Sequence, residues 1–271
     1  MNGQIYHIPV LLKEVLEALD VKPGEKYIDC TFGGGGHFRA IQKAGGIVLG
    51  IDQDPEAKAP VHGNFAHLKK IAVEAGFNAV DGILMDLGVS SHQLETDYRG
   101  FSFNREANLD MRMDPKNQTV TSADLVNAGS EKELANLFWK FGEERANRAV
   151  AKAIVEARPI TTTNRLAEIV LRVRKHSPKD RTHPATRIFQ ALRIAVNNEL
   201  ENLEEALPQV MELLKPGGKL VVISFHSLED RIVKNFMKKS PLIRPTKEEI
   251  EQNPRARSGK LRIYEKITER N

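Results

Sequence analysis

Short apolar runs alternate with helical patterns in the first third of the chain. Runs of strand length and composition lie at residues 27–32, 46–52, 61–65 and 79–87. Apolar residues at helical spacing lie before and between them, over residues 10–19, 37–44 and 66–75. Strands that alternate with helices in this way are typical of a parallel, doubly wound α/β sheet.

The alternation stops after about residue 103. Helical patterns then follow one another, at residues 121–127, 130–141, 143–157, 163–175 and 184–197. The β pattern returns at 219–225, and a helix capped by Ser227 is expected to run to Lys239. A last strand at 260–267 suits an edge or antiparallel position. We therefore predict a Rossmann-like α/β sheet over residues 1–103 and 199–271, with an inserted helical subdomain over 104–198.

Composition narrows the class of protein. The chain has 271 residues, of which 41% are hydrophobic and 28% charged, as in an ordinary globular protein. No apolar run is long enough to cross a bilayer, the N-terminus lacks the features of a secretory signal, and Cys30 is the single cysteine. These features predict a cytoplasmic protein. The net charge of +4 is compatible with a nucleic-acid partner without proving one.

Four consecutive glycines, Gly33 to Gly36, stand between the first predicted strand and the following helix. Strand, glycine turn and helix form the first unit of a nucleotide-binding fold, because a tight turn without Cβ atoms lets a ligand reach the backbone. Asp52 ends the second predicted strand, where a carboxylate binds ribose hydroxyls in such folds. The alternative is a plain glycine-rich turn without a ligand.

The residues around the turn favour one cofactor class over another. The dinucleotide fingerprint requires a third glycine where this chain has Phe38, and Asp29 would repel a pyrophosphate. An acid at Asp29 would instead attract the ammonium group of S-adenosylmethionine. Asp86 lies at the carboxyl end of the fourth predicted strand, where ligands bind in these folds, although it could also cap a helix.

With these residues in view, the chain resembles the bacterial ribosomal RNA small subunit methyltransferase H family, also called MraW. The glycine turn Asp29-Cys-Thr-Phe-Gly-Gly-Gly-Gly-His37 is one of the matching stretches. Together they span nearly the whole chain, at residues 7–12, 29–37, 50–55, 81–91, 99–103, 109–114, 142–145, 183–193, 223–234 and 253–258.

The resemblance implies a Rossmann-like methyltransferase that uses S-adenosylmethionine to methylate N4 of a cytosine in the decoding region of 16S ribosomal RNA. The expected partner is this RNA within the small ribosomal subunit. The stretch after Asp54 is shorter than expected for the family. The cofactor contacts that the resemblance implies are Gly34, Gly35, Gly36, His37, Asp52, Phe65, Asp86 and Gln93.

Candidates for contact with the substrate follow the fourth predicted strand. Other amino-methyltransferases have Asn/Asp-Pro-Pro-aromatic there, whereas this chain has Asp86-Leu-Gly-Val, so Asp86 is the leading candidate to accept hydrogen bonds from the amine. Phe101, Phe103 and Trp139 could stack on the base or pack in the core, and the core is favoured for Trp139. His226 could line the site or only precede a helix. The histidine spacing predicts no zinc site.

Basic residues are concentrated in three places, within residues 172–187, 255–262 and 145–152. We expect Lys175, Lys179 and Arg181 of the first group to contact RNA phosphates, the alternative being a solvated helix end. Two other functions stay open from the residues alone, an NAD-dependent oxidoreductase and a non-catalytic RNA-binding assembly factor.

Overall fold

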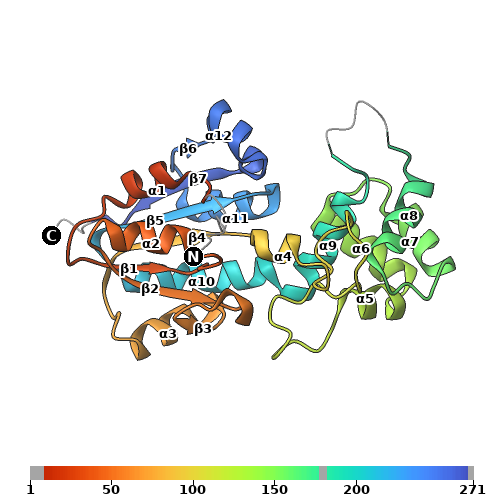
Figure 1. Cartoon of the computed structure of the whole chain (residues 1–271), viewed down its shortest axis with the longest axis horizontal. Helices are drawn as coiled ribbons and strands as arrows, with labels where there is room; N and C mark the ends of the chain where they lie inside the picture. Colours follow the sequence, from red (N-terminus) through yellow and green to blue (C-terminus); the bar gives the residue numbers. More distant parts are fainter. Residues whose placement is uncertain (1–8, 177–181, 268–271) are drawn as a thin grey trace, which may run out of the picture. The chain divides into compact units, whose positions relative to one another are not determined.

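The computed structural model describes residues 9–176 and 182–267 of the chain. The molecule divides into two compact units. The α/β unit comprises Met1–Gly88 and Leu200–Asn271, and the helical unit comprises Val89–Glu199 (Figure 1). The first boundary between the two units therefore lies at Gly88, directly after the fourth strand. We had expected this boundary about fifteen residues later, after Phe103.

The strands of the described α/β unit form one seven-stranded sheet in the order β3-β2-β1-β4-β5-β7-β6. Neighbouring strands are parallel from β3 to β5, and β7 is antiparallel to both β5 and β6. This arrangement confirms the doubly wound sheet. The strands are β1 (Lys26–Asp29), β2 (Ile47–Asp52), β3 (Val61–His62), β4 (Val80–Asp86), β5 (Leu214–Ser224), β6 (Leu242–Ile243) and β7 (Lys260–Glu265).

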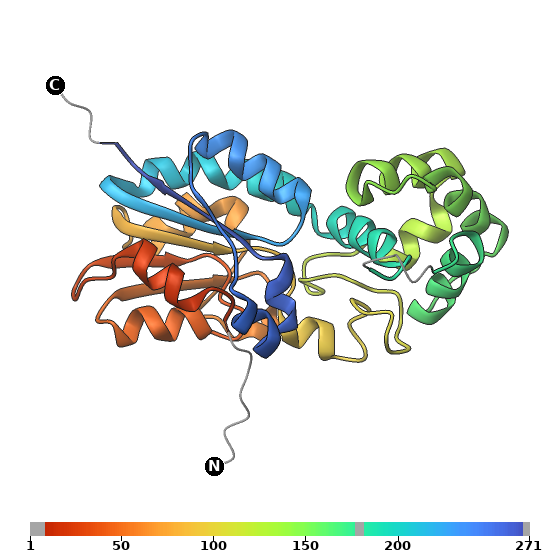
Figure 2. The ribbon, with the colours of Figure 1, turned by 90° about the horizontal axis from the view of Figure 1, so that it is seen from above.

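Helices cover both faces of this sheet (Figure 2). On one face, α1 (Leu12–Leu19) and α2 (Gly36–Lys43) pack on the strands through Val15, Leu19 and Ile41. The other face is covered by α3 (Leu68–Glu74), α10 (Glu199–Leu213) and α11 (Ser227–Met237). The apolar side chains of these helices recur at helical spacing, so one stripe of each is buried.

Shorter elements complete the α/β unit. They are the 3-10 turns η1 (Pro55–Ala57), η2 (Phe65–His67) and η3 (Pro254–Ser258), and the helix α12 (Lys247–Gln252). The last strand β7 is antiparallel, as we expected, but it does not form the edge of the sheet, because the two-residue strand β6 pairs outside it.

The helical unit has its own core. Its buried side chains include Val126, Phe138, Ile154, Leu166 and Leu192, one from each of the five longer helices. Capping boxes begin α4, α5 and α6, at Ser90, Thr121 and Ser130. The helices are α4 (Ser91–Glu95), α5 (Ser122–Ala128), α6 (Glu131–Gly142), α7 (Asn147–Glu156), α8 (Thr163–Val173) and α9 (Thr186–Asn197). In the described ranges, no helix of the chain combines the length and apolar character needed to span a membrane.

Candidate functional site

Side chains singled out from the sequence lie in a row at the carboxyl ends of the parallel strands. Phe65 follows β3, Asp52 ends β2, Asp29 ends β1 and Asp86 ends β4. The chain order reverses between β1 and β4, which is the switch point where doubly wound sheets bind their ligands. The fold therefore brings together the predicted residues of the α/β unit along one sheet edge.

The glycine turn between β1 and α2 has a backbone that only glycine adopts without strain. Gly33 has φ 50° and Gly35 has φ 70°, both in the left-handed region. A Cβ atom on Gly35 would also lie 2.7 Å from the ring of Phe32. Gly34 is exposed, and a Cβ there would meet no atom within 4 Å. The turn thus presents open backbone at the switch point.

Asp52 fastens this turn to the neighbouring strand. Its Oδ2 accepts a hydrogen bond from the backbone N–H of Gly33 at 2.7 Å, and its Oδ1 accepts one from the N–H of Asp54 at 2.8 Å. Burial raises the pKa of the Asp52 carboxyl to about 6, although these two hydrogen bonds oppose the shift. Each carboxylate oxygen can accept a second hydrogen bond, so ribose hydroxyls can still bind here.

Asp29 is buried beside the turn, with 1% of its surface exposed. Its Oδ1 accepts a hydrogen bond from the N–H of Thr31 at 3.1 Å, and its Oδ2 has no hydrogen-bond partner among the described residues. Burial raises the pKa of Asp29 to about 7, and the charge of Asp52 adds to the increase. A cation bound here would reverse this effect.

Asp86 ends β4 on the other side of the switch point. Its backbone N–H donates to Thr31 Oγ1 at 2.7 Å, and its Oδ1 is buried without a hydrogen-bond partner in the described part of the chain. Burial raises the pKa of Asp86 well above its usual value, and the negative charges of Asp29 and Glu229 act in the same direction. Asp86 does not cap a helix, because Ser90 is the N-cap of α4.

His37 lies at the start of α2 between the turn and Asp86. Its Nε2 is 3.1 Å from the carbonyl oxygen of Val10, which can only accept, so Nε2 carries the hydrogen. Its Nδ1 is 3.6 Å from Asp86 Oδ2. The imidazole is buried, with 6% exposed, and the hydrogen bond to Val10 fixes its orientation.

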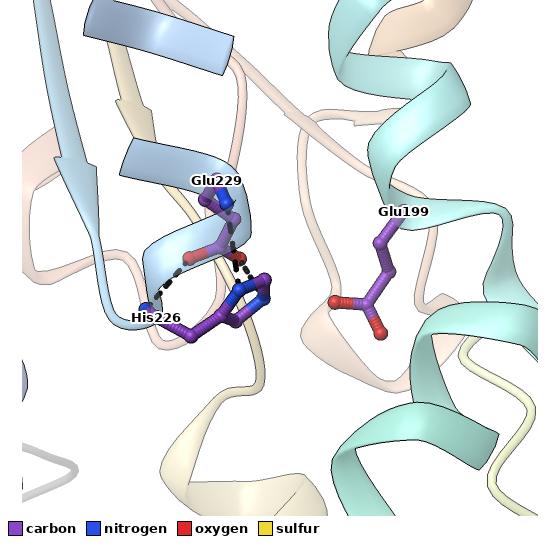
Figure 3. A group of neighbouring side chains, drawn as sticks. All are labelled: Glu199, His226 and Glu229. Atoms are coloured by element: carbon purple, nitrogen blue, oxygen red, sulfur yellow. Dashed lines mark hydrogen bonds and ion pairs between the residues drawn. The ribbon is translucent and has the colours of Figure 1, made fainter. Parts of the chain in front are cut away.

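His226 and Glu229 follow β5, the next strand of the sheet after β4. Glu229 Oε2 accepts from the backbone N–H of His226 at 3.3 Å, and His226 Nδ1 accepts from the N–H of Glu229 at 3.4 Å, which is a capping box (Figure 3). The N-cap of α11 is therefore His226, and not Ser227. In the helical unit, Glu199, also drawn in Figure 3, is paired with Arg193.

The helical unit contains the remaining predicted contacts. Gln93 is buried and its Oε1 accepts from the N–H of Ser90, so it completes the capping box of α4. Phe101 is 7% exposed within the core of the unit, which argues against a stacking platform. Phe103 is half-buried and stacks on His183, with ring centroids 4.6 Å apart. Trp139 was wrongly expected in the core, since 60% of it is exposed.

Of the basic residues expected to bind RNA, Lys175 is exposed after α8, whereas Lys179 and Arg181 lie outside the described residues. Not every basic side chain near Lys175 in the sequence is available to bind RNA. Arg174 Nη1 lies 2.8 Å from the buried carboxylate of Glu144, so the charge of Arg174 is already paired within the helical unit. The exposed basic residues of the unit include Arg145, Arg148, Lys152, Arg172 and Arg187.

Sequence reasoning missed two polar groups of the sheet edge. Thr31 Oγ1 holds the backbone of Asp86, and Glu229 faces the same edge from α11. Thr31 was visible in the sequence as a hydroxyl between the strand and the glycines. The role of Glu229 depends on the packing of β5 beside β4, which a linear pattern does not show.

Buried acids stand at the switch point where a dinucleotide enzyme binds its pyrophosphate. Unpaired carboxylate oxygens fit a cationic ligand, and S-adenosylmethionine carries both an ammonium and a sulfonium group. The molecule is an S-adenosylmethionine-dependent methyltransferase. A model of the MraW methylase family matches residues 4–242, and the chain belongs to this family. The oxidoreductase alternative is thereby excluded.

Two named relatives match this chain over nearly its full length. The chain is 45% identical to the ribosomal RNA small subunit methyltransferase H of Carboxydothermus hydrogenoformans, with 97% of this chain and 98% of the relative covered. It is 48% identical to the protein of the same name from Thermomicrobium roseum, over 96% of this chain and 94% of the relative. A crystal structure of an rRNA methylase from Streptococcus thermophilus superposes with a TM-score of 0.44 and 10% identity, over 97% of this chain and 99% of that one.

Proposed function

We propose that this protein transfers a methyl group from S-adenosylmethionine to N4 of a cytosine in the decoding region of 16S ribosomal RNA. Its relatives are named for the RNA of the small ribosomal subunit, and the family resemblance implies the cytosine amine. The observation that carries the proposal is the buried, unpaired Oδ1 of Asp86 at the end of β4, because an exocyclic amine needs a hydrogen-bond acceptor beside the methyl donor.

The glycine turn and the acids around it would hold the cofactor. Open backbone at Gly34 and the positive φ of Gly35 suit a ligand that lies against the turn. Asp52 would accept hydrogen bonds from the ribose hydroxyls, and Asp29 would face a positive group. Phe65 follows the neighbouring strand β3, which suits contact with the adenine ring. The bound cofactor supplies an electrophilic methyl group on sulfur.

The protein's contribution to the chemistry is mainly orientation. The lone pair of a cytosine amine is delocalised into the ring, so the amine is a weak nucleophile that must be aimed at the methyl group. Asp86 Oδ1 would accept a hydrogen bond from one N–H of the amine, and this bond would fix the direction of the lone pair. Thr31 Oγ1, which accepts the backbone N–H of Asp86, would keep this residue in place, and His37 Nδ1 lies 3.6 Å from the other carboxyl oxygen.

Binding of the RNA would use the helical unit. Exposed Lys175 and the neighbouring Lys179 and Arg181 would contact phosphates, which supply most of the affinity of proteins for nucleic acids. Phe103 has one ring face against His183, so at most its other face would serve a base. We propose that the substrate is the RNA within the small subunit, and that the protein acts in the cytoplasm.

The decisive experiment is mass spectrometry of nucleosides from small subunits and from naked 16S RNA, each incubated with the protein and the methyl donor. We expect N4-methylated cytidine from the wild type, and for Asp86→Ala a loss of at least about 100-fold in rate that saturating cofactor does not restore. A binding-competent wild type that methylates neither substrate would favour the RNA-binding assembly factor. A methylated carbon or a methylated purine would contradict the proposal.

A further inference from the structure

Two buried polar atoms without hydrogen-bond partners lie on neighbouring strands of the α/β unit. One is Asp86 Oδ1 after β4, and the other is His226 Nε2 after β5. Unpaired buried polar atoms are rare in folded proteins because each loses its hydrogen bonds to water. The second ring nitrogen of His226 accepts the backbone N–H of Glu229, and Asp86 Oδ2 lies 3.6 Å from His37 Nδ1. The unpaired atom of each residue is therefore the one that a ligand can satisfy.

The capping box fixes which hydrogen His226 carries. Its Nδ1 accepts the backbone N–H of Glu229 and therefore holds no proton. The hydrogen of the neutral ring must then lie on Nε2, which makes this atom a donor. Nε2 is 3.1 Å from Glu229 Oε1, yet it forms no hydrogen bond, so the N–H does not point at that oxygen. His226 thus keeps an oriented and unused donor, 9% of its side chain being exposed.

Asp86 and His226 are close in the sheet. Asp86 pairs in register with Ile223, and the N–H of Leu87 donates to the carbonyl of Ile223 at 2.9 Å. His226 follows Ile223 by three residues, and the carboxylate of Glu229 beside it acts electrostatically on Asp86. An acceptor and a donor therefore lie at the ends of neighbouring strands, at the same edge of the sheet.

We infer that Asp86 and His226 together read the edge of the target base, with Asp86 Oδ1 accepting from N4–H of cytosine and His226 Nε2–H donating to N3. This inference rests on the proposed function and deepens it. N4–H and N3 are adjacent on cytosine, and one donates while the other accepts, which complements the pair on the protein. Glu229 positions His226 through the capping box. The contact of His226 to N3 also keeps the N4 amine aimed at the methyl group of the cofactor.

The same pair explains a selection among bases. Uracil and guanine present an acceptor at the exocyclic position and a donor on the ring nitrogen, the reverse of cytosine, so both protein atoms would face a group of their own kind. Adenine shares the pattern of cytosine on this edge, and its exclusion requires the size of the site. His226 is thus a specificity-determining residue for amine-bearing bases.

The test compares cytidine with 3-deazacytidine, which lacks the N3 acceptor, at the target position of an otherwise identical RNA. His226→Ser keeps an N-cap side chain for α11 but removes the donor, and Thr246→Ser exchanges the N-cap of α12 as a matched control. For the wild type and the control we expect methylation and RNA affinity, the latter measured with S-adenosylhomocysteine bound, to fall about 10- to 100-fold on removal of N3. For His226→Ser we expect equal values for the two bases, with cofactor affinity unchanged.

If His226→Ser discriminates between the two bases as strongly as the wild type, or if the wild type does not discriminate, the inference is wrong. If the wild type methylates an atom other than N4, the proposed function fails instead, which product analysis shows directly. Should His226→Ser lose cofactor binding, His226→Asn is the second variant, because asparagine is also a strong N-cap and its side chain is too short to reach the same point.

Discussion

The backbone N–H of Gly33 donates to Asp52 Oδ2 at 2.7 Å and ties the glycine turn to the end of the neighbouring strand. One carboxylate therefore shapes the turn and also stands where the ribose of the cofactor is expected. Its other oxygen is bound to the N–H of Asp54. The carboxylate is held from two sides, so its orientation is fixed before any ligand arrives, which reduces the cost of ordering it on binding.

Replacement of Asp52 should therefore damage binding more than folding. We expect Asp52→Ala to weaken S-adenosylmethionine binding by at least about 100-fold, because two charge-assisted hydrogen bonds to ribose and the support of Gly33 are lost together. Calorimetric titration measures this. Glu17→Ala, which removes an exposed acid on α1, is the control, and near wild-type affinity in Asp52→Ala would remove Asp52 from the site.

Binding of the cofactor should depend on pH through Asp29. The pKa of this buried carboxyl is raised to about 7 and that of Asp52 to about 6. At lower pH both carboxyls are protonated, so the cationic cofactor must displace these protons when it binds. Affinity should fall as pH decreases below 7, by about tenfold per unit for one displaced proton. Titration in buffers of different ionisation enthalpy should show proton release at pH 6.5. Asp29→Asn should bind weakly and show no release from this position.

The same pKa predicts an opposite effect on stability without cofactor. A carboxyl whose pKa is raised in the folded state binds its proton more tightly there than in the unfolded chain, so stability falls as pH rises from about 4 to 7. Asp29→Asn removes this cost. We expect the variant to have a higher Tm than the wild type at pH 8 and a similar Tm at pH 4. An equal or lower Tm at pH 8 would show that Asp29 is not buried at a cost.

The sequence predicted what depends on local pattern. The first four strands and the glycine turn were found because each has its own apolar run or glycine signal. The helix α10 was missed, although Leu203, Ala206, Leu207 and Val210 have helical spacing, because Pro208 lies inside it. The strand β6 has two residues, too few to form a pattern.

Errors at the level of single residues have equally physical causes. Trp139 follows Phe138, which belongs to the buried stripe of α6 with Leu134 and Ala135, and one residue corresponds to a turn of about 100° around the helix. Trp139 therefore points to solvent. Phe101 follows β4 in sequence, but it packs in the helical core, because proximity along the chain does not decide which core a side chain joins. Histidine is an uncommon N-cap, so Ser227 was the more evident choice.

Neutralising Lys175, Lys179 and Arg181 together should weaken RNA binding and flatten its dependence on salt. Each phosphate that a basic side chain binds releases counterions, so the slope of log K against log salt should decrease by up to about 0.9 for each phosphate that is no longer neutralised. Cofactor affinity should not change. A triple variant of the exposed Lys13, Lys22 and Lys58 in the α/β unit carries the same charge change. If the first variant keeps the wild-type slope, these three residues do not bind the RNA.

Cys30 should be dispensable for catalysis. Methylation of a pyrimidine carbon generally needs a cysteine thiolate that adds to the ring, and Cys30 is the single cysteine of the chain. It is 1% exposed in the core of the sheet, and burial raises the pKa of its thiol well above the usual value, so the thiolate is disfavoured. We expect Cys30→Ala to keep most of the activity and to lose about 1 kcal/mol of stability from a small cavity. Loss of activity in a folded, cofactor-binding Cys30→Ala protein, or a covalent adduct with RNA containing a 5-fluoropyrimidine, would overturn direct transfer to the amine.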